Sequence, residues 1–395
     1  MLICTSFVIK IAYSSQLVSI IPAFNSTKSS ATLGMTFYYL TYAASQIVIS
    51  CWIKKINMKA YIVVTTVVSA ISFVLMMFVR EMWQMWAIMG VNGILQSGIY
   101  GGCMSYMGRY LPDSWSATLS KLLSFNSVAS SILAYAISAF FMAVLDWRYT
   151  FLFCSVVLLI SVMFFYVVVI TVRKKVPPAN KIAQSEGIQD ADDALINKMS
   201  RAKVYGIFSF TLVAALIINC GYYGINTWIP NLLKEKHGVD ESIALLITLV
   251  MPIAIYFGSV AAIGICKKKT NYFLVGSLFL AMGAACSFGL IFTYDINMVA
   301  ALLLSFLYLF FVRGVHIVFT AYIPMKMKHV VDVGKTSMIS NAAVSLGAAA
   351  MPFVSGLVMD MLGWQKYYVV ILGVSGVAAL MLLAAALIQG KKKLF

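Results

Sequence analysis

The chain has 395 residues, of which 62% are hydrophobic and only 11% are charged, and its mean hydropathy is +0.93. A soluble domain averages roughly half apolar and about a quarter charged residues, so this composition excludes an ordinary soluble protein. The formal net charge of +16 would suit a nucleic-acid binder. Here the basic residues fall in alternating loops between apolar runs, and we therefore expect lipid as the partner and no nucleic acid.

Twelve apolar runs match the length of a membrane-spanning helix, which is about 20 residues. We place them at 2–24, 33–53, 60–79, 82–107, 116–145, 149–172, 204–232, 241–266, 271–293, 296–323, 336–361 and 364–389. The first run has no basic segment before it and no small-residue cleavage site after it. We interpret it as a span and not as a signal peptide, and we allow for a cytoplasmic lead-in missing from this sequence.

One long polar stretch, Arg173 to Lys203, separates the sixth run from the seventh. It contains Pro177, Pro178 and a cluster of aspartates. We interpret residues 173–203 as a cytoplasmic linker between two six-helix halves, residues 1–172 and residues 204–395.

The two halves repeat each other weakly. The motif LDWRYTFLF from Leu145 opens the sixth run, and LGWQKYYVV from Leu362 opens the twelfth. Short motifs that end at Pro22 and at Pro230 close the first and seventh runs. Matches at equivalent places indicate a duplicated half. The predicted fold class is an all-α membrane protein of twelve transmembrane helices in two pseudo-symmetric six-helix halves.

Lysine and arginine gather in the even-numbered loops, the central stretch and the tail, for example at residues 54–59, 267–269 and 391–393. The opposite loops are poorer in these residues, and most of them carry an acidic residue, as at Glu235 and Asp360. Because cytoplasmic loops carry the excess of Lys and Arg, we expect both termini to be cytoplasmic. We expect a multi-pass protein of the inner (plasma) membrane that acts as a monomer.

Four stretches carry a resemblance to a known family: residues 36–59, 90–112 (GVNGILQSGIYGGCMSYMGRYLP), 222–240 (YYGINTWIPNLLKEKHGVD) and 356–373. The chain resembles the major facilitator superfamily over nearly its whole length. Within it, the chain is most similar to the organophosphate:phosphate antiporter group, which includes glycerol-3-phosphate and hexose-phosphate transporters. The resemblance implies transport by alternating access, with spans 1, 4, 7 and 10 lining the path.

The sequence departs from that group where a phosphate would bind. The group places an arginine eight residues before the proline in spans 1 and 7, and this chain has Ser14 and Tyr222 there. The histidine of the group's fifth span maps near Ser127. In the superfamily's loop signature the aspartate position holds Lys54. Because Arg and Lys are the usual phosphate ligands, these changes disfavour a phosphate ester as the solute.

The charges well inside the apolar runs are basic. Arg313 lies in the middle of the tenth run, and Lys10 lies about eight residues, or ~12 Å, into the first. Charge in hydrocarbon is expensive and usually serves a function. For Lys10 the alternative is snorkelling toward the interface, and for Arg313 it is structural hydrogen bonding. His316, three residues after Arg313, is either a proton carrier or a neutral side chain bonded between helices.

Uncharged polar residues in the spans complete the predicted substrate-binding set. They are Ser14 and Gln16 in span 1, Gln96 and Tyr100 in span 4, Asn126 in span 5, Tyr222 and Asn226 in span 7, and Asn341 in span 11. Tyr13, Asn92 and Tyr223 are similar polar residues in spans 1, 4 and 7. Side chains of this kind also hold helices together in lipid, so each has a structural alternative.

Buried cations without buried acids favour a negatively charged cargo. We therefore predict a secondary transporter, with antiport among its modes, for a small polar, anionic organic solute. Two alternatives stay open: a proton-coupled exporter of drugs or metabolites, and a transporter-like membrane sensor. The three histidines are scattered with no HExxH motif, and the seven cysteines form no CxxC pair, so we expect no enzyme, metal or cofactor.

Overall fold

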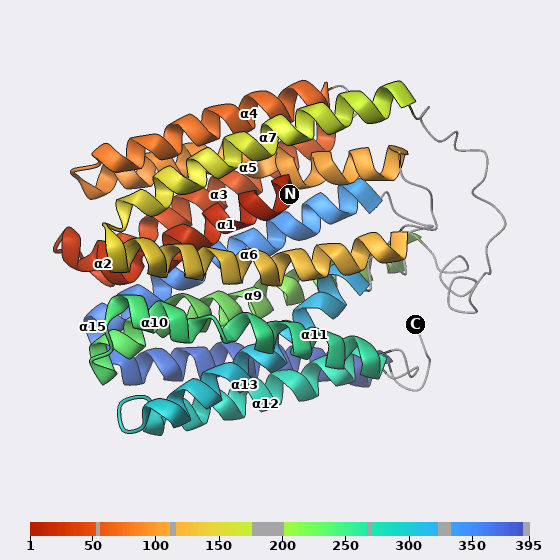
Figure 1. The fold of residues 1–395 in the computed structure, drawn as a ribbon. Coiled ribbons are helices and arrows are strands. Elements are labelled where there is room, and N and C mark those ends of the chain that lie inside the picture. The colour runs from red at the N-terminus through yellow and green to blue at the C-terminus, as the bar shows by residue number, and fades with distance from the viewer. Residues whose placement is uncertain (53–55, 111–115, 176–200, 267–270, 323–332, 390–395) are drawn as a thin grey trace.

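The structure is a computed structural model that describes residues 1–52, 56–110, 116–175, 201–266, 271–322 and 333–389. All regular secondary structure in these ranges is helical, which confirms the predicted fold class. The helices lie alongside one another with a shared long direction (Figure 1). We call the end where α7 stops and α9 starts the linker end, and the opposite end, at the left of Figure 1, the far end.

The N-terminal half is made of helices α1 to α7. They are α1 (Leu2–Ser15), α2 (Leu17–Ala23), α3 (Lys28–Trp52), α4 (Met58–Val74) with the short η1 (Leu75–Phe78), α5 (Met82–Tyr110), α6 (Ser116–Val144) and α7 (Arg148–Lys175). The C-terminal half is made of α9 (Arg201–His237), α10 (Glu241–Thr248), α11 (Met251–Cys266), α12 (Tyr272–Thr293), α13 (Met298–Ile317), η3 (Val318–Tyr322) and α15 (Val333–Gln389).

Every predicted run overlaps at least one helix, but several ends differ. α3 begins at Lys28 and not at residue 33, and α9 continues to His237 and not to residue 232. Hydropathy marks the apolar part of a helix, whereas hydrogen bonding continues through polar residues beyond it. Of the predicted linker 173–203, the ends belong to α7 and α9, and residues 176–200 lie outside the described ranges.

Three predicted spans or span pairs contain a break. The first span bends by 45° at Gln16, between α1 and α2. The eighth is interrupted between α10 and α11. The eleventh and twelfth form the single element α15, broken at Gly363, whose φ of 82° suits glycine because it has no side chain to clash. The turn between these two spans is thus a one-residue change of direction.

Within the described ranges, seven helices are long and apolar enough to cross a membrane, or eight if the bent α1–α2 pair is one span. One of the seven, Met338–Ile388, has 51 residues and covers two predicted spans. α3 and α5 are not among these helices. Both carry buried polar side chains, Gln46 in α3 and Asn92 and Gln96 in α5, which lower their hydropathy while facing protein.

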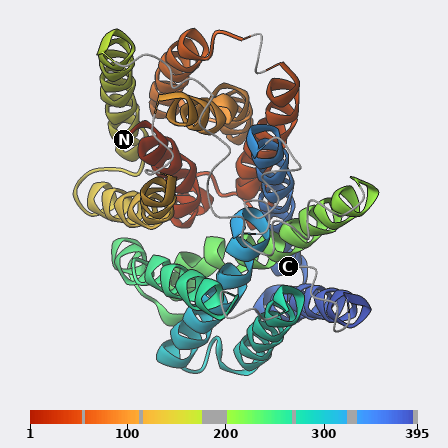
Figure 2. The same ribbon diagram turned by 90° about the vertical axis from the view of Figure 1, so that its right-hand side faces the viewer.

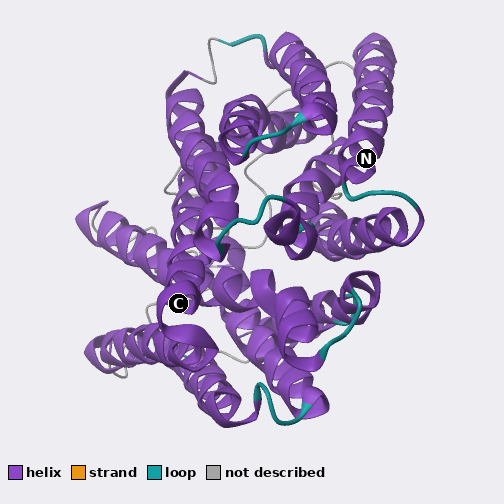
Figure 3. Ribbon diagram, turned by 90° about the vertical axis from the view of Figure 1, so that its left-hand side faces the viewer, coloured by secondary structure: helices purple, strands orange, loops and turns teal. Residues whose placement is uncertain are grey.

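Each half has its own hydrophobic core. One cluster of buried side chains is built mainly from α1 to α7 and the other from α9 to α15. A small third cluster, Tyr135 and Ala139 of α6 with Leu245 of α10, lies where the halves meet. Viewed from the linker end, the halves form two groups of helices, with part of α15 beside α3 (Figure 2). The view from the far end shows the loops that connect neighbouring helices (Figure 3).

Helices α11 and α13 approach each other through glycine. A Cβ atom on Gly258 would lie 1.9 Å from the carbonyl oxygen of Phe310, and one on Gly314 would lie 2.6 Å from the carbonyl oxygen of Gly258. Both distances are shorter than van der Waals contact with backbone atoms, which cannot rotate away. Small residues that let helix backbones touch are a common device in membranes.

We expect Gly258→Ala to lower the melting temperature of the purified protein by several degrees. The added methyl group must push α11 from α13, and overpacking of this kind costs about 1–3 kcal/mol. Gly264→Ala on the same helix is the matched control, because a Cβ there meets nothing within 4 Å. The control should melt at the native temperature or slightly above it. Equal melting of both variants and the native protein would contradict the close contact.

Candidate functional site

Lys10 of α1 ends among aromatic rings. Its Nζ lies 3.9 Å from the centroid of the Tyr42 ring, 4.9 Å from that of Phe7 and 5.9 Å from that of Tyr38. The residue is 9% exposed, so its ammonium does not reach the surface as snorkelling would require. A desolvated cation over an aromatic face gains about 2 kcal/mol, which holds the ammonium in place without a carboxylate.

Arg313 of α13 is held in the same manner by α9. Its guanidinium carbon lies 4.5 Å from the centroid of the Tyr222 ring, and its Nη1 donates to Oδ1 of Asn219 at 3.3 Å. The ion pairs among the described residues join Lys28 to Glu235, Arg148 to Asp146 and Lys234 to Glu241. Neither Lys10 nor Arg313 has a carboxylate partner within those ranges.

Five tyrosines connect the two cations, and we call them the tyrosine row: Tyr42, Tyr38 and Tyr39 of α3, then Tyr223 and Tyr222 of α9. Successive ring centroids in this order lie 5.9, 5.2, 5.5 and 4.8 Å apart. These are ordinary distances for interacting aromatic pairs. The row therefore runs from Lys10 in the N-terminal half to Arg313 in the C-terminal half and crosses between the halves at Tyr39 and Tyr223.

Hydrogen bonds join the halves beside the row. The Tyr39 hydroxyl donates to the Tyr223 hydroxyl at 3.5 Å, and Nδ2 of Asn341 in α15 donates to the Tyr42 hydroxyl at 3.2 Å. Lys10 is close enough to Tyr223 for an electrostatic interaction, although the two belong to different halves. The place where the halves meet, which we call the seam, thus carries both cations, the tyrosine row and Asn341.

Comparison with known proteins decides the family. A family model described as Major Facilitator Superfamily matches residues 1–339. The chain belongs to the major facilitator superfamily. Among curated proteins, no sequence is similar enough to count as a relative.

Solved structures of transporters share the fold. A bacterial homolog to the human lysosomal transporter Spinster, in an inward-facing and unoccupied conformation, has a TM-score of 0.71 at 13% identity, covering 98% of this chain and 96% of that chain. Its inward-facing and occupied form gives 0.70 at 12% identity, with 98% and 93% covered. A mutant of the nucleoside transporter NupG gives 0.66 at 13% identity, with 97% and 98% covered. These structures show the fold, and the family match over residues 1–339 makes this chain a multi-pass membrane transporter of the superfamily.

In this superfamily transporter, several predicted site residues lie at the seam, and others lie inside the N-terminal half. Tyr222, Asn341 and Asn226 are at the seam, the last donating from Nδ2 to the Tyr135 hydroxyl at 3.4 Å. Tyr100 of α5 belongs to the N-terminal half and is partly buried. Asn126 of α6 is partly buried, and its carbonyl accepts from Ser130.

Gln96 belongs to a buried polar network within the N-terminal half. Its Oε1 accepts from Ser6 Oγ at 3.1 Å and from the Tyr38 hydroxyl at 3.0 Å, and its Nε2 donates to Ser69 Oγ at 3.0 Å. The amide thereby ties α5 to α1, α3 and α4. Its contact with the row is indirect, because it fixes the hydroxyl of Tyr38.

Two predicted residues of span 1 bond to the protein itself. Ser14 donates to the carbonyl of Ile11 in its own helix at 2.8 Å, and Gln16 donates from Nε2 to Thr150 Oγ1 of α7 at 2.7 Å. Gln16 is fully buried at the bend between α1 and α2. Its role in binding stays a prediction, as does that of Ser14.

His316 lies one turn beyond Arg313. Its Nδ1 is 3.3 Å from Thr320 Oγ1, while its Nε2 is buried and has no hydrogen-bond partner among the described residues. The helix continues into the π-helical segment Val318–Tyr322, a conformation that often marks functional sites. A proton-carrying role for His316 stays a prediction.

Three members of the tyrosine row, all on α3, were not among the predicted site residues. Tyr38 and Tyr42 are one turn apart on one helix face, and Tyr39 is their neighbour in sequence. The sequence does contain a hint of the row, because spans 2 and 7 each contain two adjacent tyrosines, Tyr38-Tyr39 and Tyr222-Tyr223. This pattern does not predict a site, because an aromatic residue in a span can face either lipid or protein, and only the packing of the helices shows which.

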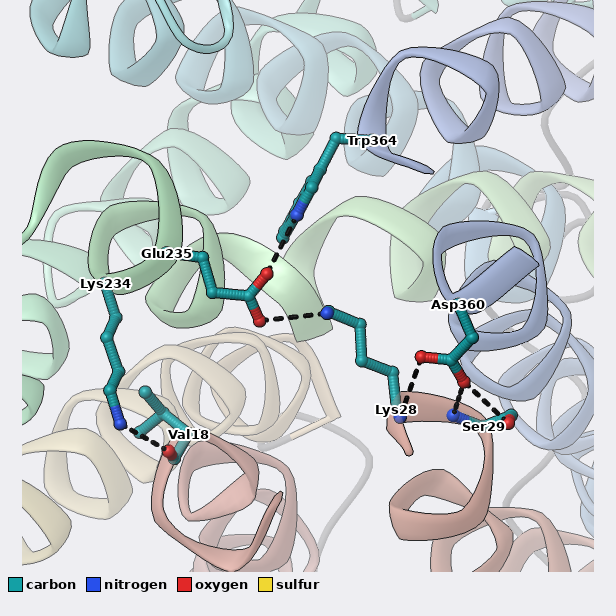
Figure 4. A network of polar contacts seen from close by, with 7 residues as sticks. All are labelled: Val18, Lys28, Ser29, Lys234, Glu235, Asp360 and Trp364. Carbon is teal, nitrogen blue, oxygen red and sulfur yellow. Dashed lines mark hydrogen bonds and ion pairs between the residues drawn. The ribbon is translucent and has the colours of Figure 1, made fainter. Parts of the chain in front are cut away.

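At the far end the seam is closed by polar contacts between the halves (Figure 4). Lys28 Nζ pairs with Glu235 Oε1 at 3.0 Å, and Trp364 Nε1 donates to Oε2 of the same carboxylate at 3.0 Å. Lys234 pairs with Glu241 and donates to the carbonyl of Val18 at 3.3 Å. The closure thus links α2 and α3 to α9, α10 and α15.

Asp360 of α15 caps the start of α3. Its carboxylate accepts from the backbone N–H groups of Lys28 at 3.0 Å and Ser29 at 2.8 Å, and from Ser29 Oγ at 2.7 Å (Figure 4). A helix N-terminus has unpaired N–H groups and a positive dipole end, so an anion is favourable there. This cap comes from the other half of the molecule, and it must be released if the halves separate at the far end.

We expect Asp360→Ala to increase the population in which the far end is open. Hydrogen bonds to a charged group contribute about 1.5–3 kcal/mol, so losing this cap weakens the closed arrangement. Spin labels at Thr27 and Ile296, in a background without the native cysteines, would report the change as a longer component in their distance distribution. Glu81→Ala, a far-end acid that forms no ion pair in the described residues, is the control. A distribution unchanged by Asp360→Ala would contradict the role of the cap.

Proposed function

We propose that this transporter carries a small polar organic anion by alternating access, with Lys10 and Arg313 as its anion-binding groups. One observation carries the proposal: each half contributes one cation to the tyrosine row, Lys10 buried and Arg313 partly buried, and neither has a carboxylate partner in the described residues. A cation away from water is costly unless it is paired. A negatively charged solute supplies the missing partner.

The placement of the cations suits alternating access. Lys10 belongs to the N-terminal half and Arg313 to the C-terminal half, so a solute that contacts both lies between the parts that must move. Tyr222, Tyr100, Asn226 and Asn341 would complete its surroundings. Gln96, Gln16, Ser14, Asn126 and His316 remain candidates of lower rank, the first three because their side chains already bond within the protein.

We propose that the chain is related by ancestry to the organophosphate:phosphate antiporter group. Such a relationship would fit a protein that exchanges one anion for another. The two cations do not stand where that group keeps its arginines, which favours a carboxylate or another organic anion over a phosphate ester. We propose that the linker end faces the cytoplasm of a cell whose inner (plasma) membrane holds the protein, in agreement with the lysine-rich loops there.

The energy source that drives transport, which is anion exchange or a proton gradient, separates this proposal from its alternatives. An exchanger of anions needs no titratable group in the path, whereas proton-coupled export would make use of His316, whose Nε2 is buried without a partner in the described residues. Uptake into proteoliposomes with and without a pH gradient distinguishes the two. A sensor would bind a ligand tightly and transport none of it.

We expect Arg313→Gln and Lys10→Gln each to abolish or strongly reduce binding and uptake of the solute. The solute is first found by thermal shift of the purified protein against paired small anions and their neutral analogues. A ligand at 100 times its dissociation constant adds about 2.7 kcal/mol of stability, which is readily measured. Removing a buried charge partner costs about 2–5 kcal/mol, so binding should fall by a factor of more than ten.

Lys59→Gln is the matched control for these substitutions. Lys59 Nζ lies 4.3 Å from the centroid of the Tyr166 ring, the same kind of contact, but on α4 and α7 away from the row. This variant should bind and transport normally. The anion proposal would be contradicted if the protein bound the neutral analogues more tightly than the anions. Unchanged uptake in both Arg313→Gln and Lys10→Gln would contradict it as well.

A further inference from the structure

The contact between Tyr39 and Tyr223 is the one at which the row passes from one half to the other. Tyr39 and Tyr223 have ring centroids 5.5 Å apart with planes inclined by 60°, and their hydroxyls are joined by a hydrogen bond of 3.5 Å, the longest acceptable. The neighbouring pairs, Tyr38 with Tyr39 and Tyr222 with Tyr223, lie within a single helix. When the halves separate, the pair that must part is Tyr39 and Tyr223.

The hydroxyl groups of the row are largely engaged by the protein. Tyr38 donates to Gln96 at 3.0 Å, and the Tyr42 hydroxyl accepts from Gln46 at 3.1 Å and from Asn341 at 3.2 Å. Tyr39 and Tyr223 bond to each other. Apart from the Tyr39 and Tyr223 hydroxyls, which are freed when the halves part, what the row offers to a solute is therefore mainly ring surface. A sugar, which depends on hydrogen bonds, would be poorly served.

A cation lies at each end of the tyrosine row, beside the ring surface. Lys10 lies over Tyr42 and is close enough to Tyr223 for an electrostatic interaction, and Arg313 lies over Tyr222, the immediate neighbour of Tyr223. A flat ring placed between Tyr39 and Tyr223 would thus be one tyrosine away from each cation, because the centroid of the Tyr38 ring lies 5.9 Å from Lys10 Nζ and that of the Tyr222 ring lies 4.5 Å from the guanidinium carbon of Arg313. The combination of aromatic faces and unpaired cations suits one kind of molecule, an aromatic ring that carries an anionic group.

We propose that the solute is an aromatic anion whose ring stacks between Tyr39 and Tyr223 while its charged group pairs with Lys10 or Arg313. This inference rests on the proposed transport of an anion and narrows it. The solute's ring replaces the contact that the two tyrosines lose as the halves part. Aromatic pairs are favourable beyond their buried area, so the ring adds selectivity over an aliphatic anion of equal size and charge.

The test compares three probes of matched shape on the purified full chain: 2-naphthoate, its saturated analogue decahydro-2-naphthoate, and the neutral 2-naphthamide. Binding is measured by thermal shift and by isothermal titration calorimetry. We expect 2-naphthoate to bind about tenfold more tightly than the saturated anion, the ratio that a favourable ring contact provides. The neutral amide should bind more weakly than 2-naphthoate.

Substitutions in the tyrosine row test whether the preference for the aromatic anion arises from Tyr39 and Tyr223. Tyr223→Leu and Tyr39→Leu should bring the ratio between the aromatic and the saturated anion close to one, whereas Tyr223→Phe, which keeps the ring, should preserve it. Tyr256→Leu is the control for nonspecific contact, because Tyr256 is 40% exposed on α11. That variant should keep the native ratio.

The outcomes separate this inference from the function on which it rests. Equal affinity for the aromatic and saturated anions, or a ratio unchanged in Tyr223→Leu, overturns the aromatic preference and leaves anion transport standing. Binding of an aliphatic anion from the wider panel with no binding of 2-naphthoate does the same. If no anion of any kind binds, both proposals fail.

Discussion

A membrane interior supplies neither hydrogen bonds nor counter-charges, so the polar groups inside this protein depend on partners from the protein itself or from a bound solute. That constraint explains the Gln96 network, in which one amide gathers partners from three other helices. It also explains why Lys10 and Arg313 lie on tyrosine rings. An aromatic face is the partner available to a cation when no carboxylate is near, and it leaves the cation's charge uncancelled.

The seam between the halves puts the proposed binding groups and the far-end contacts on the same helices. α3 carries Lys28 and Ser29 at the far end and Tyr39 deeper in, while α9 carries Glu235 at the far end and Tyr223 deeper in. A helix moves as a nearly rigid rod. Displacing α3 from α9 would therefore disturb the ion pair and the tyrosine contact together, which couples access to occupancy without any further linkage.

The structure shows a role for three acidic residues that the sequence did not indicate. In the sequence, Glu235, Glu241 and Asp360 mark loops on the side poor in lysine, and they carry information about topology alone. In the structure each of them has a partner in the other half: Lys28 for Glu235, Ser19 for Glu241 and the start of α3 for Asp360. These contacts join residues more than 200 positions apart in the chain, and no local pattern announces them.

The sequence by itself determined what depends on composition and period: a helical membrane protein, its apolar runs, and two cations inside them. It also singled out Tyr222, Asn226 and Asn341, which lie at the seam and whose binding role stays a prediction, because a polar side chain in an apolar run is conspicuous wherever it points. Only the tertiary structure decided that Tyr38, Tyr39 and Tyr42 join Lys10 to Tyr223, and that Asp360 caps α3. The physical reason is that a tyrosine is compatible with lipid, core and binding site alike, so its role is set by the neighbours that folding brings to it.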